Sequence, residues 1–523
     1  MVNATDKANA LSQQYSSVFT TEDLSHVPRV AGTPVPSIEP LTINLEGVEK
    51  LLSNIDPKKA SGPDGVPSTI LKYLSMELAP IITHIFQQSL DTGDIPPDWL
   101  TANITAIFKK GDKSIPANYR PVSLTSVTCK LFEHVLFRHI MSHLEKHNVL
   151  SSFQHGFRAQ HSCESQLIIT VEDLSRNLDN KLQTDVLILD FQKAFDTVPH
   201  QRLIQKLDFY GIRGNILTWI TKWLTSRTQQ VVVDGKSSEP SPVKSGVPQG
   251  TVLGPLMFLI HINDISDNLD SSTEIRLFAD DCLLYRSISS QEDSQSLQKD
   301  LNSLVEWSSK WQMSFNTRKC KTLRVTTKRA PTEYVYKMHN DILENVSHYP
   351  YLGVELSNNL KWSHHIHNVT VKANNSLWFI RRNLWRCAKY VKQQMYFALV
   401  RPHLEFACAV WDPHNACDIS RLEAVQRRAA RFVTNNHKRT EGTVTQILQD
   451  LQWPSLEQRR KNNRLAILYK IQNDKIAIPI PHYLCRQAVQ TRQFHPQRFS
   501  IVATHTDSYK FGFIPAQLRT GIH

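Results

Sequence analysis

The chain has 523 residues and a mass of 59.9 kDa, more than one hydrophobic core usually accommodates, so we expect several subdomains. Its composition, 41% hydrophobic and 21% charged, is that of a soluble globular protein, and it has neither a run of 18 apolar residues nor a signal peptide, which excludes a membrane-spanning protein. The net charge of +12 lies mainly in the C-terminal third and permits a polyanionic partner. The eight cysteines are scattered and include no Cys-x-x-Cys pair, which argues against disulfides and zinc knuckles. This use of cysteine predicts an intracellular location, in the nucleus or cytoplasm.

The first 57 residues are predicted to form a helix and a linker. Apolar residues between Leu11 and Phe19 have helical spacing, and prolines follow at positions 34, 36 and 40. We expect no chemistry in this segment. The folded body is expected to begin at residue 58 with a basic, turn-rich loop, 58–65, for which a solvated loop is a better explanation than a phosphate site.

Two predicted strands, 104–108 and 119–124, flank a basic loop. Lys109 and Arg120 lie at the facing ends of this strand pair. A lysine ammonium and a forked arginine guanidinium are suited to holding the phosphates of a nucleoside triphosphate. Ordinary surface charge is the alternative for these residues taken alone.

The next two candidates come from a strand end and a glycine-rich loop. An apolar strand, 185–190, ends on Asp190, and a rigid strand end is a common support for a metal-binding carboxylate. Residues 245–255 contain three glycines and two prolines before an apolar helix, so the backbone there can approach a ligand closely, and Gln249 offers both a donor and an acceptor. A plain loop-to-helix junction is the alternative.

Adjacent carboxylates interrupt an apolar stretch at 277–285. The pattern is typical of a buried β-hairpin with Asp280 and Asp281 at its tip. A polar turn is the alternative for an isolated pair of aspartates. Two like charges held near a core repel each other, and a divalent cation would relieve that repulsion. Together with Asp190, the pair predicts three converging carboxylates that can bind two Mg²⁺ ions.

The C-terminal part is predicted to be helical and basic. A strand is expected over 349–354, where Gly353 permits a close backbone contact, and helices follow from residue 362. Basic and aromatic residues alternate in these helices, as suits a surface that lies along nucleic acid. Helices that merely bury an aromatic stripe are the alternative. The basic residues expected to bind nucleic acid are Arg381, Arg382, Arg386 and Lys389.

Eight short motifs between residues 60 and 431 occur in an order that resembles the reverse transcriptases of non-LTR retrotransposons, in particular the jockey-like and chicken-repeat-like elements. Each motif is weak alone, but their order is specific. The Phe-Ala before the paired acids is typical of this family, where retroviral enzymes usually have Tyr-x. The motifs are Phe108-Lys109-Lys110-Gly111-Asp112, Tyr119-Arg120-Pro121, Gln154-x-Gly156-Phe157-Arg158, Asp190-x4-Phe195-Asp196, Ser245-Gly246-Val247-Pro248-Gln249-Gly250, Phe278-Ala279-Asp280-Asp281, Asn316-x-x-Lys319 and Tyr351-Leu352-Gly353-Val354.

The resemblance implies an α+β right-hand polymerase. The fingers and palm would occupy residues 58–356, with the core motifs at 103–356 and an antiparallel sheet plus helices in the palm. A basic helical thumb would follow at 357–435, and a basic helical extension of unknown role at 436–523. The implied activity is RNA-directed DNA synthesis, with an RNA template, a DNA primer or target and deoxynucleoside triphosphates as partners.

The resemblance also implies roles for individual residues. The catalytic, metal-binding set would be Asp190, Asp280 and Asp281 with the backbone carbonyl of Phe191, holding two Mg²⁺ ions or Mn²⁺ in their place. Within the nucleotide site, Phe195 would exclude a ribose 2′-hydroxyl, and Lys319 would protonate pyrophosphate. The nucleotide-binding residues would be Lys109, Arg120, Phe195, Gln249 and Lys319, and the primer grip would be Tyr351, Leu352 and Gly353.

Several alternatives accompany this interpretation. Full-length relatives have an endonuclease upstream, and nothing before Ala60 resembles one, so we expect another chain to nick the target. An intron maturase or telomerase-like enzyme is disfavoured by the Phe-Ala-Asp-Asp motif. A dehalogenase-like phosphatase would need an aspartate where Gln192 stands. A catalytically inert nucleic-acid-binding remnant of a retrotransposon stays open as the alternative function.

Overall fold

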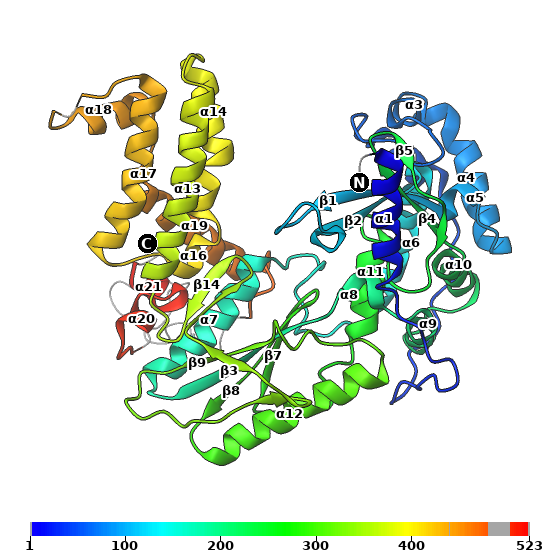
Figure 1. Ribbon diagram of the computed structural model, residues 1–523, viewed down its shortest axis with the longest axis horizontal. Coiled ribbons are helices and arrows are strands. Elements are labelled where there is room, and N and C mark those ends of the chain that lie inside the picture. Colours follow the sequence, from blue (N-terminus) through cyan, green and yellow to red (C-terminus); the bar gives the residue numbers. More distant parts are fainter. Residues whose placement is uncertain (1–2, 439, 480–502, 521–523) are drawn as a thin grey trace, which may run out of the picture.

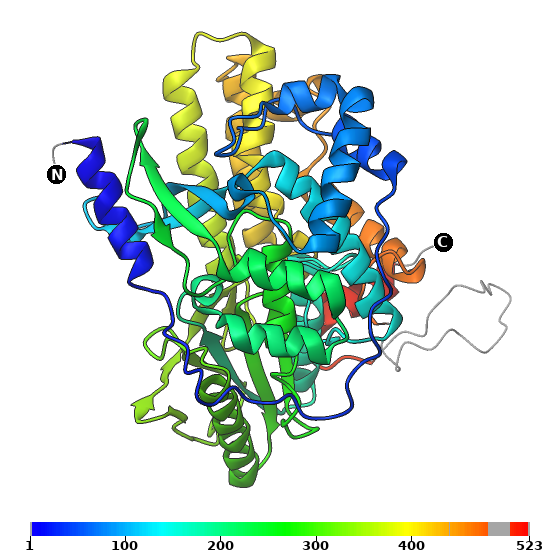
Figure 2. The ribbon, with the colours of Figure 1, turned by 90° about the vertical axis from the view of Figure 1, so that its right-hand side faces the viewer.

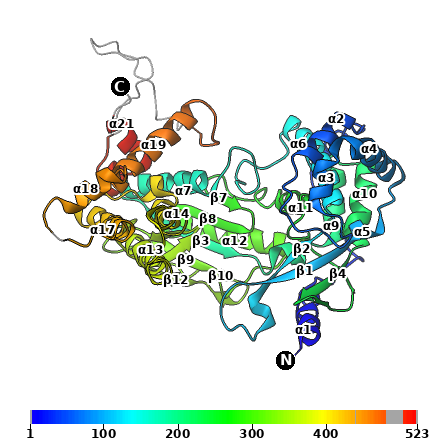
Figure 3. The same ribbon diagram turned by 90° about the horizontal axis from the view of Figure 1, so that it is seen from above.

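The computed structural model describes residues 3–438, 440–479 and 503–520. Within these ranges the chain is α+β, as predicted, with two five-stranded sheets and many helices. Figure 1 shows the N-terminal sheet and its helices on one side, a central sheet in the middle and the C-terminal helices on the other side, and Figure 3 shows the same order from above. Residues 480–502 of the predicted C-terminal extension, including Cys485, lie outside the described residues.

The N-terminal sheet has the strand order β2-β1-β4-β5, with β6 also paired to β4. Alternate residues of β1 point into the protein, where Ala102 and Ile104 are buried. β1 pairs antiparallel with β2, which confirms the predicted strand pair, and parallel with β4. The strands are β1 (Thr101–Phe108), β2 (Tyr119–Leu124), β4 (Thr228–Val233), β5 (Lys236–Ser237) and β6 (Ser241–Pro242).

Helix α1 (Ala4–Ser16) packs on this sheet. It begins and ends several residues earlier than predicted, because the Asn3 side chain caps its first turn. Leu11 and Tyr15 of α1 form a small core with sheet residues that include Ile104. Figure 2 shows α1 at the edge of the molecule and the chain that follows it running across the body toward the next helices. The N-terminal segment is therefore part of the folded body rather than a separate linker.

A larger core lies beside the N-terminal sheet. Its centre is aromatic: the Phe86 and Phe132 rings are 4.9 Å apart, and the Trp219 ring meets Phe132 edge to face at 5.0 Å. These rings come from helices far apart in sequence, so they tie the helices into one unit. The helices of this region are α2 (Leu45–Ser53), α3 (Ser68–Tyr73), α4 (Ser75–Thr92), α5 (Pro97–Leu100), α6 (Val127–Lys146), α8 (Ala194–Thr197), α9 (His200–Phe209), α10 (Gly214–Thr225) and α11 (Leu253–Ile262), with a 3-10 turn at Pro116–Asn118.

The central sheet has the order β12-β9-β3-β8-β7. Its middle strand β3 is buried throughout except at Asp190, which explains its nearly continuous apolar sequence. The sheet is antiparallel, as predicted, except between β9 and β12, which run parallel. The β10–β11 hairpin carries the chain back to start β12 beside β9. The strands are β3 (Gln183–Asp190), β7 (Glu274–Phe278), β8 (Asp281–Ile288), β9 (Lys321–Val325), β10 (Lys337–Met338), β11 (Asp341–Ile342) and β12 (Glu344–Val346).

The two faces of the central sheet belong to two different cores. Leu187 and Leu189 of β3 lie in the core that includes α12 (Gln291–Lys310), whereas Val186 and Ile188 lie in the core that includes α7 (Cys163–Asp179). This division follows from the alternation of side chains along a strand. The sheet is thus held between two layers, and its strand ends stay rigid.

Residues 349–354 span a hairpin rather than the single predicted strand, since residues 349–351 and 354 are strand and only Leu352 and Gly353 turn. β13 (His348–Tyr351) and β14 (Val354–Ser357) pair antiparallel, and the chain reverses at Leu352 and Gly353. Both turn residues have positive φ, 45° and 85°, which is the backbone of a type I′ turn. The left-handed backbone of Leu352 and Gly353 therefore reverses the chain within a run of residues whose apolar pattern predicted one continuous strand.

The C-terminal part is helical among the described residues after Trp362, as predicted. Trp411 and Leu422 lie in the same core as the α7 face of the central sheet, so these helices are joined to that sheet. None of the helices in the described part of the chain has the length and apolarity needed to cross a membrane. The helices are α13 (Ser363–Asn383), α14 (Lys389–Leu399), α15 (Arg401–Glu405), α16 (Cys408–Trp411), α17 (Ala416–Thr434), α18 (Thr443–Asp450), α19 (Leu456–Gln472), α20 (Asp507–Lys510) and α21 (Phe513–Thr520).

Candidate catalytic site

Strand pairing brings the predicted acids together. β3 and β8 are neighbours, and their register sets Asp190 directly opposite Asp281. Residues opposite each other in such a pair have Cα atoms about 5 Å apart. Asp280 is in the adjacent β7–β8 turn, where Phe278 pairs with Asp281. The predicted hairpin is confirmed, but its tip is Ala279 and Asp280, one residue earlier than expected.

The tip of this hairpin is held by the loop before α7. Ala279 has a φ of 54°, which is unusual for a residue with a side chain. The Gln154 amide fixes this backbone: its Oε1 accepts from the Ala279 N–H at 2.9 Å and from the Gly156 N–H at 2.6 Å. A Cβ at Gly156 would lie 2.3 Å from the Ala279 nitrogen, so only glycine fits there. The Gln-x-Gly motif was visible in the sequence, but its contact with the acidic tip was not.

Burial and mutual repulsion raise the pKa values of the paired acids. The pKa of Asp280 lies above its ordinary value, mainly because of burial and also because Asp190 is near. The pKa of Asp281 is raised to about 6 by burial, then by the charges of Asp280 and Asp190. Lys109 and Lys319 act in the opposite direction on Asp281. The site therefore concentrates negative charge that positive groups only partly balance.

Lys319 binds one of the three acids directly. Its ammonium donates to the two carboxylate oxygens of Asp190 at 2.8 and 3.2 Å. The loop that carries Lys319 is fixed to the same strand, because the Asn316 N–H donates to the Asp190 carbonyl at 2.7 Å. Phe191 and Phe315 extend this contact through an isolated bridge and stacked rings 4.4 Å apart. The predicted proton donor thus lies at the predicted metal site.

The donor set fits a hard divalent cation in its chemistry. Carboxylates and a backbone carbonyl are the oxygen ligands that Mg²⁺ prefers, and the raised pKa values of the paired acids reflect a charge density that such an ion would neutralise. In the described ranges, no three His, Cys, Asp or Glu side chains are gathered as a ready metal centre. Asp190 instead turns its carboxylate to Lys319. A bound cation would therefore share or compete for this carboxylate with Lys319.

The predicted nucleotide-site residues Phe195 and Gln249 lie on two segments that pack together. The Phe195 ring stacks on Phe258 with centroids 4.6 Å apart and meets Phe157 edge to face at 6.1 Å. Gln249 donates through Nε2 to the Asp196 carboxylate at 3.1 Å. Burial raises the pKa of that Asp196 carboxyl group. The structure therefore brings the two predicted residues together and adds Asp196, whose role the sequence alone did not assign.

Lys109 and Arg120 extend from the N-terminal sheet toward the acids. Arg120 is opposite Ile107 in the β1–β2 pair, and both basic side chains are exposed. Partial burial lowers the pKa of Lys109, and the neighbouring charges of Arg120 and Lys319 lower it further, while Asp190 opposes the effect. These influences place Arg120, Lys319 and Asp190 within electrostatic range of Lys109. The basic groups form the positive counterpart of the acidic strand ends.

The predicted primer-grip residues form the β13–β14 turn beside the acids. Tyr351 is buried, and its hydroxyl accepts from the Gln166 amide at 3.3 Å. Gly353 faces Phe406, whose ring would lie 2.9 Å from an added Cβ. A cavity of about 240 Å³ lies between this turn and the start of β8, and Asp281, Tyr351 and Gly353 are among the residues that line it.

The four predicted nucleic-acid-binding residues lie apart from the acids. They occupy the end of α13, the connection after it and the start of α14, at the top of the C-terminal helices and distant from β3 and β8 in Figure 1. The nearby Trp378 and Trp385 are exposed by 53% and 60%, so the alternative of a buried aromatic stripe is wrong for these two rings. Arg381 and Arg386 stack on them, each 4.5 Å from a ring centre.

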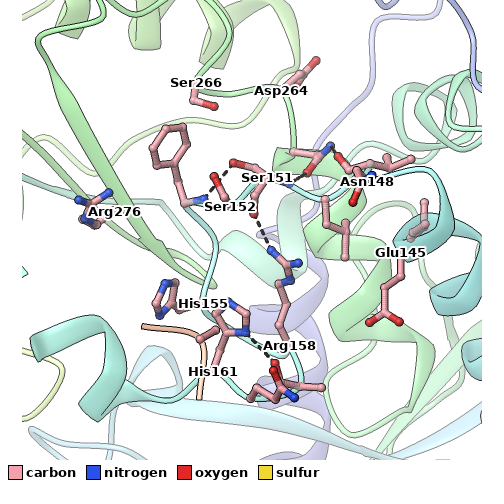
Figure 4. Close-up of a pocket in the computed structure, with 18 of the residues that line it drawn as sticks. Glu145, Asn148, Ser151, Ser152, His155, Arg158, His161, Asp264, Ser266 and Arg276 are labelled. Carbon is pink, nitrogen blue, oxygen red and sulfur yellow. Dashed lines mark hydrogen bonds between the residues drawn. The ribbon is translucent and has the colours of Figure 1, made fainter. Parts of the chain in front are cut away.

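A second cavity of about 1300 Å³ is separate from the acidic strand ends. None of the three predicted catalytic aspartates lines it. Figure 4 shows Arg158 reaching toward Ser151 across this cavity, with His155 and Arg276 at its wall. Its lining mixes acidic and basic side chains and includes Asp474 and residues 476–479. The size of a cavity therefore does not identify the catalytic centre of this protein.

Comparison with curated proteins found relatives in Drosophila melanogaster. The probable RNA-directed DNA polymerase from transposon BS is 26% identical over 486 residues, which cover 87% of this chain and 52% of that protein. The RNA-directed DNA polymerase from mobile element jockey is 27% identical over 473 residues, with 87% and 51% coverage. The probable RNA-directed DNA polymerase from transposon X-element is 28% identical over 420 residues, with 77% and 44% coverage. The chain spans about half the length of the curated relatives it matches.

A family comparison identifies the region that carries the acids. Residues 107–356 match the family described as reverse transcriptase (RNA-dependent DNA polymerase). This range includes β3, the β7–β8 hairpin and the β13–β14 turn described above. The sequence resemblance, the family match and the named relatives agree. Residues 107–356 are therefore a reverse transcriptase domain of the jockey-like, non-LTR retrotransposon kind.

Proposed function

We propose that the protein is an RNA-directed DNA polymerase that adds deoxynucleotides to the 3′-hydroxyl of a DNA primer paired to an RNA template. The observation that carries this proposal is the register of the central sheet, which sets Asp190 opposite Asp281 beside the Asp280 turn. Phosphoryl transfer needs positioned reactants and neutralised charge more than a covalent catalyst. Carboxylates on rigid strand ends suit that requirement.

The acidic residues would hold two Mg²⁺ ions, or Mn²⁺. Asp190, Asp280 and the Phe191 carbonyl would be direct ligands, with Asp281 as support. When bound, such ions neutralise the triphosphate and activate the primer hydroxyl. Lys319, now 2.8 Å from Asp190, would give its proton to the departing pyrophosphate.

The remaining residues would bind and select the nucleotide and the primer. Lys109 and Arg120 would hold the triphosphate, since both basic groups act on the acidic strand ends. The Phe195 ring, stacked on Phe258, would leave no room for a ribose 2′-hydroxyl. Gln249 would steady the nucleotide and the template. Tyr351, Leu352 and Gly353 would support the primer end.

The whole chain would have the layout of a right-hand polymerase. In this proposal, fingers and palm extend over 58–356, a basic thumb over 357–435 and a C-terminal extension over 436–523. The order of the parts in Figure 1 supports this division, because the acids lie in the middle sheet, between the N-terminal elements and the C-terminal helices. Template and primer would lie between the two flanking parts.

The test is Mg²⁺-dependent primer extension on an RNA template. Asp280→Asn removes one carboxylate charge with little change of shape, and we expect it to lower the rate about a hundredfold or more, since ionic charge stabilisation contributes several kcal/mol to such transition states. Asp91→Asn, an exposed acid on α4, serves as the control and should leave the rate unchanged. Undiminished extension by Asp280→Asn would refute the metal assignment. Template binding without extension by the unmutated protein would instead support an inert remnant.

A further inference from the structure

The N-terminal segment contacts the nucleotide side of the proposed site, although it precedes the matched residues 107–356. Thr20 makes two contacts there. Its hydroxyl donates to the Thr197 carbonyl at 2.8 Å, and its N–H donates to the Ser245 hydroxyl at 2.8 Å. Thr197 is the last residue of α8, the helix that carries Phe195. One residue of the N-terminal segment therefore bonds to both segments of the nucleotide site.

Ser245, which accepts the hydrogen bond from Thr20, is itself hydrogen-bonded to the backbone beside Phe195. The Ser245 side chain is almost fully buried, and its hydroxyl donates to the Asp196 carbonyl at 2.8 Å. The next two residues continue the attachment, because the Gly246 N–H donates to the Val198 carbonyl at 2.8 Å and the Val247 N–H donates to the Phe195 carbonyl at 2.7 Å. Every carbonyl from Phe195 to Val198 is thus bound by Thr20 or by residues 245–247.

Helix α8 needs such support. It is four residues long, and an isolated helix of that length is unstable in water. It begins after Lys193, which has a left-handed backbone with a φ of 50°. The position of the Phe195 ring and the Asp196–Gln249 hydrogen bond both depend on where this short helix lies. Contacts from outside the helix therefore determine the geometry of the nucleotide site.

The N-terminal segment is anchored on both sides of Thr20. Before it, Tyr15 of α1 is buried against the N-terminal sheet, with a hydroxyl that has no hydrogen-bond partner among the described residues and lies near the Asp196 charge. After it, the Glu22 carboxylate accepts from the backbone N–H groups of Gln201 and Arg202 at 2.9 Å each. The Arg202 guanidinium also bonds to Glu22 at 3.1 Å, in a largely buried ion pair. The segment can thus act as a strut between the sheet and helix α9.

We propose that residues 15–23 form a positioning strut for nucleotide selection, with Thr20 and Ser245 holding the backbone that carries Phe195. Thr20 and Ser245 are positioning residues, since they act through Phe195 and Gln249. The inference rests on the proposed polymerase function and extends it to a segment where the sequence predicted no chemistry. It requires that loss of the Thr20 hydroxyl changes how the protein chooses between deoxynucleotides and ribonucleotides.

The test compares kcat/KM for deoxynucleotides and ribonucleotides in primer extension. Thr20→Val removes the bond to Thr197 and keeps the volume, and Ser245→Ala removes the link to Asp196. Each is expected to raise the KM for deoxynucleotides and lower sugar selectivity about threefold to tenfold, the effect of one lost hydrogen bond. Thr20→Ser restores the hydroxyl and should restore both quantities. Ser53→Ala, which removes an exposed hydroxyl bonded within helix α2 and outside the strut, is the matched control. Phe195→Val gives the reference for full loss of sugar selection.

The outcomes separate the two proposals. An inactive unmutated protein overturns the polymerase function and this inference with it. An active protein whose Thr20→Val and Ser245→Ala variants keep their selectivity and deoxynucleotide KM overturns the strut alone. An equal loss of kcat for both sugars, with selectivity unchanged, also overturns it, because that result indicates a structural role only. If Ser245→Ala does not fold, Thr20→Val with its Thr20→Ser rescue decides the question.

Discussion

At the scale of single residues, the acidic turn at Ala279 and Asp280 depends on a tightly packed contact with Gly156. Gly156 lies against the backbone of Ala279, and the Gln154 side chain bonds to both. Protein interiors are packed too tightly to absorb an added methyl group at such a point without movement. Any shift of Ala279 would displace the neighbouring Asp280, so this glycine controls the geometry of the proposed catalytic turn without containing a reactive group.

Gly156→Ala should therefore reduce activity more than it reduces stability. The added Cβ would push against the Ala279 nitrogen and move the turn, and we expect extension to fall about tenfold or more, while unfolding becomes easier by about 1–3 kcal/mol. Primer-extension rates and denaturant unfolding of the same preparations measure both. Gly47→Ala in α2 is the control, since its Cβ would meet only the Asn44 side chain, no closer than 3.7 Å. Normal activity in Gly156→Ala would contradict the proposed role of this contact.

At the scale of elements, the tip of α13 and α14 presents a surface that is both aromatic and cationic. Trp378 and Trp385 are exposed, and Arg381 and Arg386 lie over their rings. A soluble surface seldom gathers large exposed aromatic side chains without a binding role. Nucleic acid offers phosphates for the cations and bases or sugars for the rings. This tip is therefore suited to bind a nucleic-acid duplex along its sugar–phosphate backbone.

Replacing Arg382 and Arg386 together by glutamine should weaken duplex binding and its salt dependence. Each phosphate contact contributes about one unit to the slope of log affinity against log salt, so we expect the slope to fall by about two. Fluorescence anisotropy with an RNA–DNA duplex at several salt concentrations measures this. Lys146→Gln, which removes an exposed lysine paired with Glu39, is the control. An unchanged slope in the double variant would exclude the tip from the binding surface.

At the scale of the whole molecule, the chain ties its C-terminal part to the sheet that carries the acids. The Asp179 carboxylate at the end of α7 accepts from the His505 and Thr506 N–H groups and from the Thr506 hydroxyl, at 2.6 to 2.8 Å. These partners are more than 300 residues apart in sequence. Asp179 is almost fully buried, so loss of its carboxylate would leave several donors without an acceptor.

Asp179→Ala should release residues 503–510 locally. Hydrogen bonds to a charged acceptor contribute about 1.5–3 kcal/mol, so amide protection in this segment is expected to fall about tenfold to a hundredfold. Hydrogen exchange read by mass spectrometry measures that loss, and protection of β3 should stay unchanged. Asp450→Ala is the control, because Asp450 is exposed and bonds within its own helix. Equal protection of residues 503–510 in both variants would show that Asp179 does not hold this segment.

Much of the candidate site was predictable from local patterns. The apolar run before Asp190 and the apolar runs around Asp280 are confirmed as strands, and the basic pair Lys109 and Arg120 does flank a loop between two strands. Alternation, strand ends and turns depend on neighbouring residues, so short-range chemistry is sufficient to predict them. The errors arose where a local signal was ambiguous, as at Leu352 and Gly353, where an apolar run contains a turn.

The sequence by itself determined which residue types stand at the strand ends and in which order the motifs follow. Only the tertiary structure decided which of them meet: Asp190 beside Asp281, Gln154 on Ala279, and Thr20 on Ser245, a pair 225 positions apart. The physical reason is that a contact between distant segments depends on how whole layers pack, and no local periodicity encodes that packing. The N-terminal segment illustrates this difference, since its sequence predicted a helix and a linker and its contacts reach the proposed nucleotide site.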